Sequence, residues 1–192
     1  MVVGVFGGSF NPVHNGHIAL AREVVRQGLA DRVMMVLSPQ NPLKEHPEAL
    51  VADEDRLAML RLACKGVPEL EASDIELSMP RPSYTINTLR RLTLERPADS
   101  FRLIMGADNW AGFPRWRESG EILRHYSPIV YPRPGFPMPE AGSGARGMGA
   151  SLFPVSSTEV RRRLEKGEPV NNLLPPEVLS YIKQHGLWKQ TQ

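Results

Sequence analysis

The stretch that decides the fold of this chain reads Gly7-Gly8-Ser9-Phe10-Asn11-Pro12-Val13-His14-Asn15-Gly16-His17. It follows an apolar run over residues 2–6 and precedes a helix-like run over residues 18–28. A turn between a strand and a helix presents backbone N–H groups at the positive end of the helix dipole, which attracts phosphate. His14 and His17 are three residues apart at the helix start, so both imidazoles can face the same point. The stretch therefore predicts an α/β fold with a phosphate-binding turn that also carries two imidazole donors.

Strand-like and helix-like runs alternate along the rest of the chain. The expected strands cover residues 2–6, 32–37, 70–75, 101–105, 128–131 and 152–155. The expected helices cover residues 18–28, 53–65, 85–95, 158–166 and 176–185, and a surface loop covers the Gly- and Pro-rich residues 134–150. This alternation predicts a parallel sheet with helices on both faces. Because such sheets bind ligands beyond the carboxyl ends of their strands, the turns after Phe6, Leu37, Met105 and Tyr131 should face one site.

Composition narrows the class of protein. The 192 residues, 41% hydrophobic and 23% charged, are expected to form one globular domain over residues 1–192, in which the helices after about residue 158 pack on the sheet. The net charge of +2 gives no support to nucleic-acid binding, and a small anionic ligand suffices to explain it. The single cysteine, Cys64, is expected to be a buried thiol, which favours a reducing compartment. With no apolar run near membrane length and no leader pattern, we expect a cytoplasmic protein that does not bind membranes.

A second anion-binding motif lies far along the chain, at Ser156-Ser157-Thr158-Glu159-Val160-Arg161. Ser157 or Thr158 can N-cap the following helix, and Arg161 lies one turn inside it. A helix N-terminus with an arginine is a good site for an anion. The next two residues, Arg162 and Arg163, are interpreted as solvated.

Both motifs resemble those of the nucleotidyltransferase superfamily that carries the H-x-G-H signature, in which they bind ATP phosphates. The resemblance implies a Rossmann-like three-layer α/β sandwich with a mostly parallel sheet. It also implies that His14, His17 and Arg161 act on the ATP phosphates during catalysis, together with Lys44, which follows the second strand. The further ATP contacts that it implies are Gly7, Gly8, Ser9, Phe10, Gly16, Gly106, Asp108, Ser156, Ser157 and Thr158.

The second substrate is predicted from Pro82-Ser83-Tyr84-Thr85-Ile86-Asn87-Thr88-Leu89. This stretch resembles one in bacterial nicotinate-nucleotide adenylyltransferases, where the backbone near the threonine receives the nicotinate carboxylate. Thr85 opens a predicted helix, where N–H groups attract a carboxylate. Trp116 resembles the tryptophan that stacks on the pyridine ring in that family, although Arg117 stands where some members have an aromatic residue. The resemblance thus implies mononucleotide contacts at Ser83, Tyr84, Thr85 and Trp116, with Arg133 as a weaker phosphate contact.

The expected reaction joins ATP and nicotinate mononucleotide into nicotinate adenine dinucleotide and pyrophosphate. Mg²⁺ is expected as a cofactor held mainly by the ATP phosphates, and no Cys/His cluster indicates a metal site of the protein itself. Two alternatives stay open: a different acceptor, such as nicotinamide mononucleotide or a phosphopantetheine-type phosphate, and a non-catalytic nucleotide-binding domain. The sequence also leaves the oligomeric state open, a homo-oligomer included.

Overall fold

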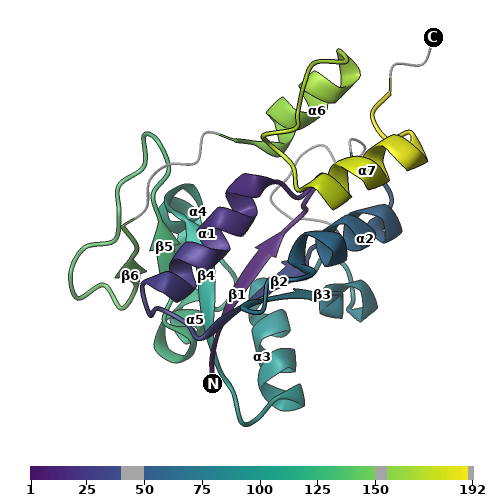
Figure 1. Ribbon diagram of the computed structural model, residues 1–192. Coiled ribbons are helices and arrows are strands. Elements are labelled where there is room, and N and C mark those ends of the chain that lie inside the picture. The colour runs from purple at the N-terminus through teal and green to yellow at the C-terminus, as the bar shows by residue number, and fades with distance from the viewer. Residues whose placement is uncertain (40–49, 150–154, 190–192) are drawn as a thin grey trace.

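The computed structural model describes residues 1–39, 50–149 and 155–189. Within these residues, six strands form one sheet in the order β3-β2-β1-β4-β5-β6, and every neighbouring pair is parallel (Figure 1). The strands are β1 (Val2–Gly8), β2 (Arg32–Leu37), β3 (Leu70–Ser73), β4 (Ser100–Gly106), β5 (Ile129–Tyr131) and β6 (Arg146–Gly147). The chain builds outward from β1 through β2 to β3, then crosses to β4 on the other side of β1. Ligands bind at such a switch point, which here lies between the carboxyl ends of β1 and β4.

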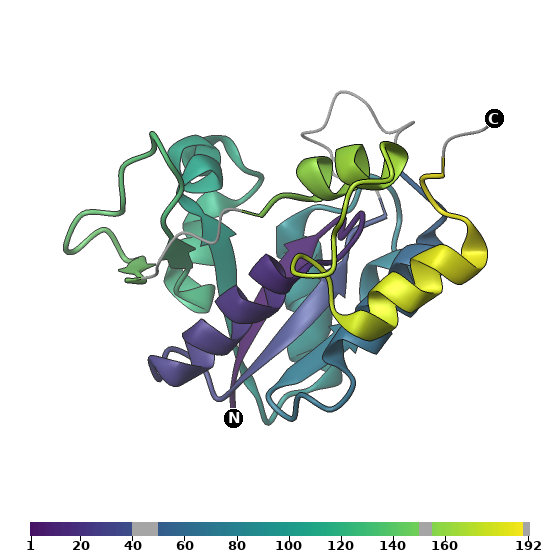
Figure 2. The same cartoon turned by 45° about the horizontal axis from the view of Figure 1, so that its top comes forward.

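Helices cover both faces of the sheet, as predicted. They are α1 (Asn15–Arg26), α2 (Asp53–Cys64), α3 (Thr85–Glu95), α4 (Ala107–Gly112), α5 (Ser119–Tyr126), α6 (Ser157–Glu165) and α7 (Pro176–His185). Figure 2 shows α1 and α7 in front of the strands and α3 behind them. Two short 3₁₀ turns, Ile75–Ser78 and Phe113–Arg115, complete the regular structure of the described residues.

The central strand β2 is largely apolar because both of its faces are covered. In β2 the side chains alternate: Val33 and Met35 join the core under α1 and α2, whereas Met34 and Val36 join the core under α3 and α5. The β2 residues from Val33 to Leu37 are all buried. The sheet is therefore the middle layer of a three-layer sandwich, which confirms the predicted fold class.

Some predicted elements differ from the structure. Residues 134–150 contain the short strand β6, where a surface loop was expected, and residues 107–126 form two helices that Gly112 and Pro114 obscured in the sequence. The strand expected over residues 152–155 falls mostly outside the described residues, and Val155 has no regular structure.

The predicted start of α6 needed correction. Its N-cap is Ser156, not Ser157 or Thr158, and the Ser156 hydroxyl accepts a hydrogen bond from the Glu159 amide at 3.1 Å. The last helix, α7, packs mainly against α2, and its Val178 and Ile182 side chains join the same core cluster as Met35 of the sheet.

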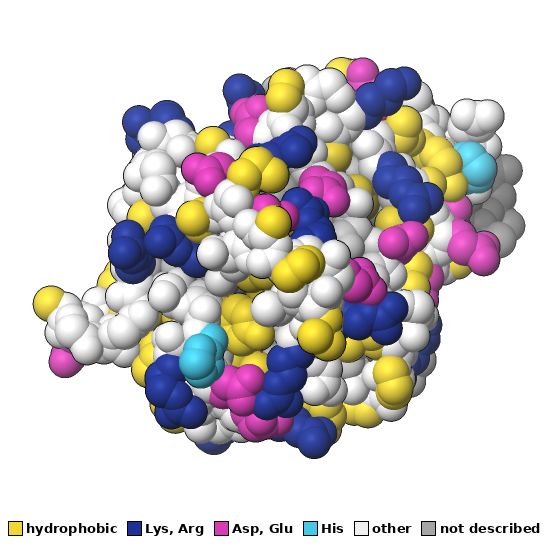
Figure 3. Space-filling model, turned by 90° about the horizontal axis from the view of Figure 1, so that it is seen from below, with side chains coloured by type: hydrophobic (Ala, Val, Ile, Leu, Met, Phe, Trp, Pro, Cys, Tyr) yellow, Lys and Arg dark blue, Asp and Glu magenta, His cyan; other side chains and the backbone are white. Residues whose placement is uncertain are grey.

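Three features of the structure relate to the expectations from composition: the surface charge, the cysteine and the length of the helices. Figure 3 shows the face at the amino ends of the strands, where Lys and Arg side chains are interspersed with Asp and Glu, so neither sign of charge dominates this face. Cys64 is buried, and burial raises the pKa of its thiol to about 11. Among the described helices, none has the length and apolar character that crossing a bilayer requires.

Candidate active site

The turn after β1 is closed by packing between its own residues. Phe10 has a φ of +41° and is 2% exposed, and its ring packs edge-on against Phe6 and His17 at centroid distances of 5.8 and 5.1 Å. A Cβ on Gly8 would lie 3.0 Å from the Phe10 ring, so glycine permits this close approach. The Phe10 side chain is therefore part of the core, and only its backbone is placed to meet a nucleotide.

The two histidines lie together at the start of α1, as their spacing predicts. Their rings stack at a centroid distance of 3.6 Å, with 22° between the ring planes. The His14 amide donates to Nδ1 of His17 at 3.2 Å. Because Nδ1 accepts this hydrogen bond, the proton of the neutral His17 ring sits on Nε2, and that nitrogen can act as a donor.

His14 is buried in an environment that disfavours its charged form. Burial, and then the positive charge of Arg133, lower the pKa of His14 from 6.5 to about 4. Its Nδ1 is buried without a hydrogen-bond partner among the described residues. His14 is thus a neutral imidazole at physiological pH, next to positive charge, in a place where an incoming anion would improve its environment.

The α6 motif meets the β1 turn although about 150 residues separate them in sequence. The Ser157 hydroxyl donates to the Pro12 carbonyl at 3.0 Å, and the Arg161 guanidinium donates to the Asn11 carbonyl at 2.8 Å. Arg161 also donates to the Thr158 hydroxyl at 3.3 Å. The structure therefore brings the two predicted phosphate motifs together and holds the N-terminus of α6 against the turn.

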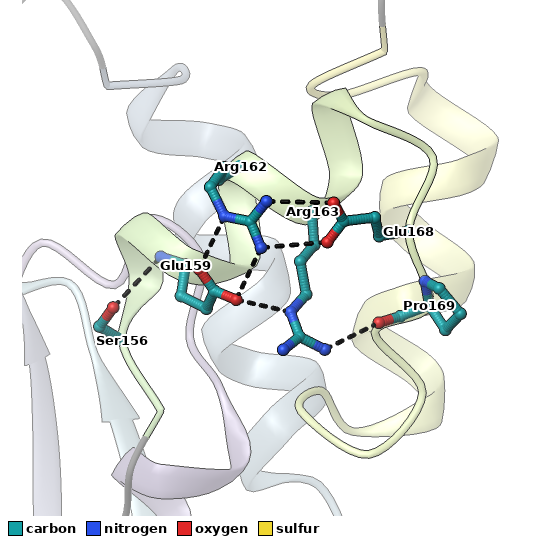
Figure 4. Close-up of polar contacts among 6 residues, drawn as sticks. All are labelled: Ser156, Glu159, Arg162, Arg163, Glu168 and Pro169. Carbon is teal, nitrogen blue, oxygen red and sulfur yellow. Dashed lines mark hydrogen bonds and ion pairs between the residues drawn. The ribbon is translucent and has the colours of Figure 1, made fainter.

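The neighbouring arginines of α6 are partly exposed, as expected, and both also form surface ion pairs. Glu159 accepts hydrogen bonds from Arg162 and Arg163 at 2.7 to 2.9 Å, and Glu168 accepts from Arg162 at 3.0 and 3.1 Å (Figure 4). These two arginines lower the pKa of Glu159 to about 2. Of the three consecutive arginines, Arg161 is the one bonded to the β1 turn.

A cavity of about 620 Å³ opens beside the turn, between the carboxyl ends of β1 and β4 and the N-terminus of α3. This is the switch point of the sheet. Predicted site residues that line the cavity are Gly7, Gly8, Ser9, Ser83, Tyr84, Thr85, Gly106, Asp108 and Trp116. Those outside its lining are Phe10, His14, Gly16, His17, Arg133, Ser156, Ser157, Thr158 and Arg161. The cavity is thus lined by the residues predicted for the mononucleotide except Arg133, whereas His14, His17 and Arg161, predicted for the ATP phosphates, lie outside its lining.

Asp108 and Arg133 form an ion pair at the end of β4 and β5. Asp108 Oδ1 lies 3.8 Å from Arg133 Nε, and the Arg133 guanidinium lies 5.1 Å from the centre of the Tyr131 ring. A Cβ on Gly106 would lie 2.2 Å from the Asp108 carboxylate, so a side chain there would push Asp108 away. This pair places one carboxylate and one cation on the rim of the site, where a ribose hydroxyl and a phosphate could be bound.

Tyr84 and Trp116 are aromatic residues that line the cavity and contact further side chains behind it. Trp116 packs against Phe113 at a ring-centroid distance of 5.8 Å, and Trp110 stacks on Phe113 at 5.1 Å. The Arg117 guanidinium lies 4.9 Å from the centre of the Tyr84 ring. Arg117 therefore occupies one side of the Tyr84 ring by a cation–π contact, where an aromatic residue was expected in the family.

Two buried charged residues in or near the site were not predicted. Arg56 is 0% exposed and donates to the carbonyls of Ser9, Ser38 and Val51 at 2.7, 2.9 and 3.1 Å, and it is also paired with Asp53. Glu76 is 7% exposed and lines the cavity. Arg56 stands within the apolar helix run over residues 53–65, a weak signal of a buried cation, whereas Glu76 carries no signal that we can identify. The predicted catalytic residue Lys44 lies outside the described residues.

Two motifs predicted to bind phosphate meet at one turn beside a switch-point cavity, an arrangement typical of α/β proteins of nucleotidyltransferase type. Residues 5–163 match the family model described as cytidylyltransferase-like. A probable nicotinate-nucleotide adenylyltransferase of Bacteroides thetaiotaomicron is 42% identical over 184 residues, which cover 95% of this chain and 91% of that relative. One from Thermus thermophilus is 37% identical over 190 residues, which cover 98% and 100%.

Solved structures agree with the fold. Plasmodium falciparum nicotinic acid mononucleotide adenylyltransferase complexed with NaAD has a TM-score of 0.77 and 19% identity, covering 97% of both chains. At this identity the likeness shows the fold alone. The sequence relatives and the family model together place the chain: it belongs to the cytidylyltransferase-like family and, within it, to the nicotinate-nucleotide adenylyltransferases.

Proposed function

We propose that this protein transfers the adenylyl group of ATP to nicotinate mononucleotide, producing nicotinate adenine dinucleotide and pyrophosphate for NAD biosynthesis. The observation that carries the proposal is the junction of the β1 turn and α6, made by Arg161 and Ser157, beside the cavity that Thr85 and Trp116 line. We propose that the two nucleotides bind here with their phosphates meeting beside the β1 turn. The family of the sequence relatives supports the same reaction.

The chemistry requires positioning and charge stabilisation more than a covalent nucleophile. An oxygen of the mononucleotide phosphate attacks the α-phosphorus of ATP, the bond from that phosphorus to the β-phosphate bridging oxygen breaks, and pyrophosphate leaves. The attacking phosphate is already anionic, so no general base is needed to activate it. Catalysis then rests on holding the two phosphates in line and on donors that stabilise the charge moving to the leaving group.

The histidine pair supplies donors for that charge. The neutral His17 ring would hold its proton on Nε2, and His14 is neutral before substrate arrives, so each imidazole can act as an N–H donor. Arg161 supplies a permanent positive charge at the same turn, and Lys44 is proposed to add a second. Donors aimed at developing charge are stronger in the transition state than in the ground state, which is what accelerates the step.

Mg²⁺ is proposed to enter as the complex with ATP, where it neutralises charge on the phosphates. The described residues hold no cluster of three or more His, Cys, Asp or Glu side chains that could ligate a metal. A metal carried by phosphate oxygens and water fits such surroundings, since Mg²⁺ in phosphoryl-transfer sites is held largely by the nucleotide. The buried free thiol Cys64 suits a reducing compartment, and the cytoplasm is our proposed location.

The nicotinate end is proposed to lie in the cavity, with its carboxylate at the N-terminus of α3 and its ring near Trp116. Tyr84, the N-cap of α3, makes no side-chain hydrogen bond to the helix. The first amides of a helix lack intrahelical acceptors and favour an anion. This favours the acid over the amide, because an uncharged carboxamide gains less from the dipole.

The test is pyrophosphate release from the purified protein with ATP, Mg²⁺ and a panel of acceptors: nicotinate mononucleotide, nicotinamide mononucleotide and 4′-phosphopantetheine. We expect the highest kcat/KM with nicotinate mononucleotide. A higher kcat/KM with another acceptor would keep the adenylyl transfer and overturn the acceptor. ATP binding without pyrophosphate release from any acceptor would overturn the enzyme and leave a nucleotide-binding domain.

A further inference from the structure

Glu76 is a buried carboxylate whose two oxygens are both occupied by hydroxyls. It lies in the 3₁₀ turn Ile75–Ser78, is 7% exposed and lines the cavity. The Thr88 hydroxyl donates to Oε1 at 2.7 Å, and the Ser83 hydroxyl donates to Oε2 at 3.0 Å. Burying a carboxylate is costly unless its oxygens are hydrogen-bonded, so this bridge needs both donors.

The two hydroxyls occupy special positions at the start of α3. Tyr84 is the N-cap, so Ser83 is the residue before the cap and Thr88 is the fourth residue of the helix. In many helices a hydrophobic contact between these same two positions fixes the angle at which the chain enters the helix. Here Glu76 joins them through two hydrogen bonds, and we call this bridge the polar staple.

The polar staple bears directly on the first amides of α3. Thr85 and Ile86 are the first two residues of α3, and Thr85 lines the cavity. Their N–H groups are among those that a helix cannot satisfy internally. The direction of these two N–H bonds depends on how the chain turns into the helix, and the staple holds both sides of that turn.

We propose that Glu76 is a positioning residue for the mononucleotide: it fixes the N-terminus of α3 so that the Thr85 and Ile86 amides meet the carboxylate of the acceptor. The inference rests on the proposed function and extends it to the residue that sets substrate recognition. It also reassigns Ser83. The hydroxyl of Ser83 was expected to contact the substrate, but in the structure it donates to Glu76, so its role is to hold the turn.

A purely electrostatic effect of Glu76 would have the opposite sign. A carboxylate near the α3 N-terminus would repel the substrate carboxylate, so removing its charge would tighten mononucleotide binding. The polar staple instead predicts weaker binding when the bridge is lost. Gln at this position keeps the shape and removes the charge, since its oxygen can accept from Thr88 and its amide can donate to the Ser83 hydroxyl. Comparing Ala with Gln therefore separates the two effects.

The experiment measures KM for nicotinate mononucleotide and for ATP separately, with kcat, in wild type, Glu76→Ala and Glu76→Gln. We expect Glu76→Ala to raise KM for the mononucleotide about tenfold, the loss typical of misplaced charge-assisted hydrogen bonds. KM for ATP should stay within about twofold, and Glu76→Gln should recover most of the loss. Thr93→Val is the control within α3, because the Thr93 hydroxyl makes its contacts toward the other end of the helix. It donates to the Leu89 carbonyl at 2.9 Å and lies 3.4 Å from the Tyr126 hydroxyl.

Two smaller variants keep the test decisive if Glu76→Ala fails to fold. Ser83→Ala and Thr88→Val each remove one of the two hydrogen bonds, and each should raise KM for the mononucleotide about threefold. An unchanged or lowered KM in the folded variants, or equal rises in both KM values, would overturn the inference. A wild-type protein that makes no nicotinate adenine dinucleotide would instead overturn the proposed function, and the inference with it.

Discussion

Acid should lower the free energy of unfolding of this protein partly through His14, and a substitution of His14 should remove that part of the pH dependence. Burial and the nearby Arg133 lower the pKa of His14 from 6.5 to about 4 in the folded protein. Between these two pH values the unfolded chain binds a proton that the folded protein excludes. The stability that the neutral ring contributes is therefore fully present above about pH 6.5 and is lost as the pH falls toward 4.

The size of the effect follows from the shift. One pKa unit is worth about 1.4 kcal/mol, so the whole shift corresponds to about 3 kcal/mol. About 2 kcal/mol of this should be lost between pH 7 and pH 4.5. A loss of this size is a large fraction of the stability of an ordinary domain.

The assay is urea unfolding at pH 7 and pH 4.5 for wild type, His14→Asn and His125→Asn. Asn at position 14 does not titrate, so the free energy of unfolding of His14→Asn should fall by about 2 kcal/mol less than that of wild type over this range. The variant His125→Asn removes an exposed histidine of α5 and should lose as much as wild type. Equal losses in wild type and His14→Asn would show that His14 is not buried as a neutral ring and would refute the reasoning.

Three further predictions concern the turn and its supports. Replacing His17 by Ala should lower kcat about a hundredfold with little change in the thermal midpoint of unfolding, because a donor to developing charge is lost. Steady-state pyrophosphate release measures this, and activity like wild type would contradict the role of the histidine pair. Arg161→Ala should raise KM for ATP about tenfold, because Arg161 bonds the β1 turn. Arg162→Ala removes only contacts with partners within and after α6, so it should change KM for ATP less than about twofold. Similar KM values for the two variants would count against the assignment of Arg161. Arg56→Met should lower the free energy of unfolding by about 3 kcal/mol, because three carbonyls lose the charged donor of a buried guanidinium. Arg61→Met removes an exposed ion pair with Asp74 and should change the free energy of unfolding by less than about 0.5 kcal/mol. Equal urea midpoints for the two variants would contradict the role of Arg56.

Local patterns predicted the framework well. The apolar runs and the residues that end them indicated strands β1, β2, β4 and β5, and helices α1, α2, α3, α6 and α7 begin within a few residues of their predicted starts. Hydrophobic periodicity is a property of consecutive residues, so it can be read without knowing any long-range contact. The same holds for the histidine pair, because residues three apart at a helix start are neighbours whatever the rest of the chain does.

Elements that depend on distant partners were missed. The strand β6 has only two residues, and it exists because Arg146 and Gly147 pair with β5. Helices α4 and α5 form around Gly112 and Pro114 because Phe113 and Ile122 are buried against the sheet, which no local pattern shows. In both places tertiary packing overrides weak local propensity.

By itself, the sequence determined the class of fold and the residue types that bind phosphate, because both follow from short-range spacing around the β1 turn. Only the tertiary structure decided what each of those residues does. In the folded protein, Arg161 is bonded to the β1 turn, whereas Arg162 is paired with two glutamates. His14 is buried, and this burial keeps its ring neutral. Folding also gave the Ser83 hydroxyl a hydrogen bond to Glu76 that the sequence did not indicate. Hydrogen-bond partners and pKa values depend on which groups are in contact in the folded protein, and many of these contacts are between residues far apart along the chain.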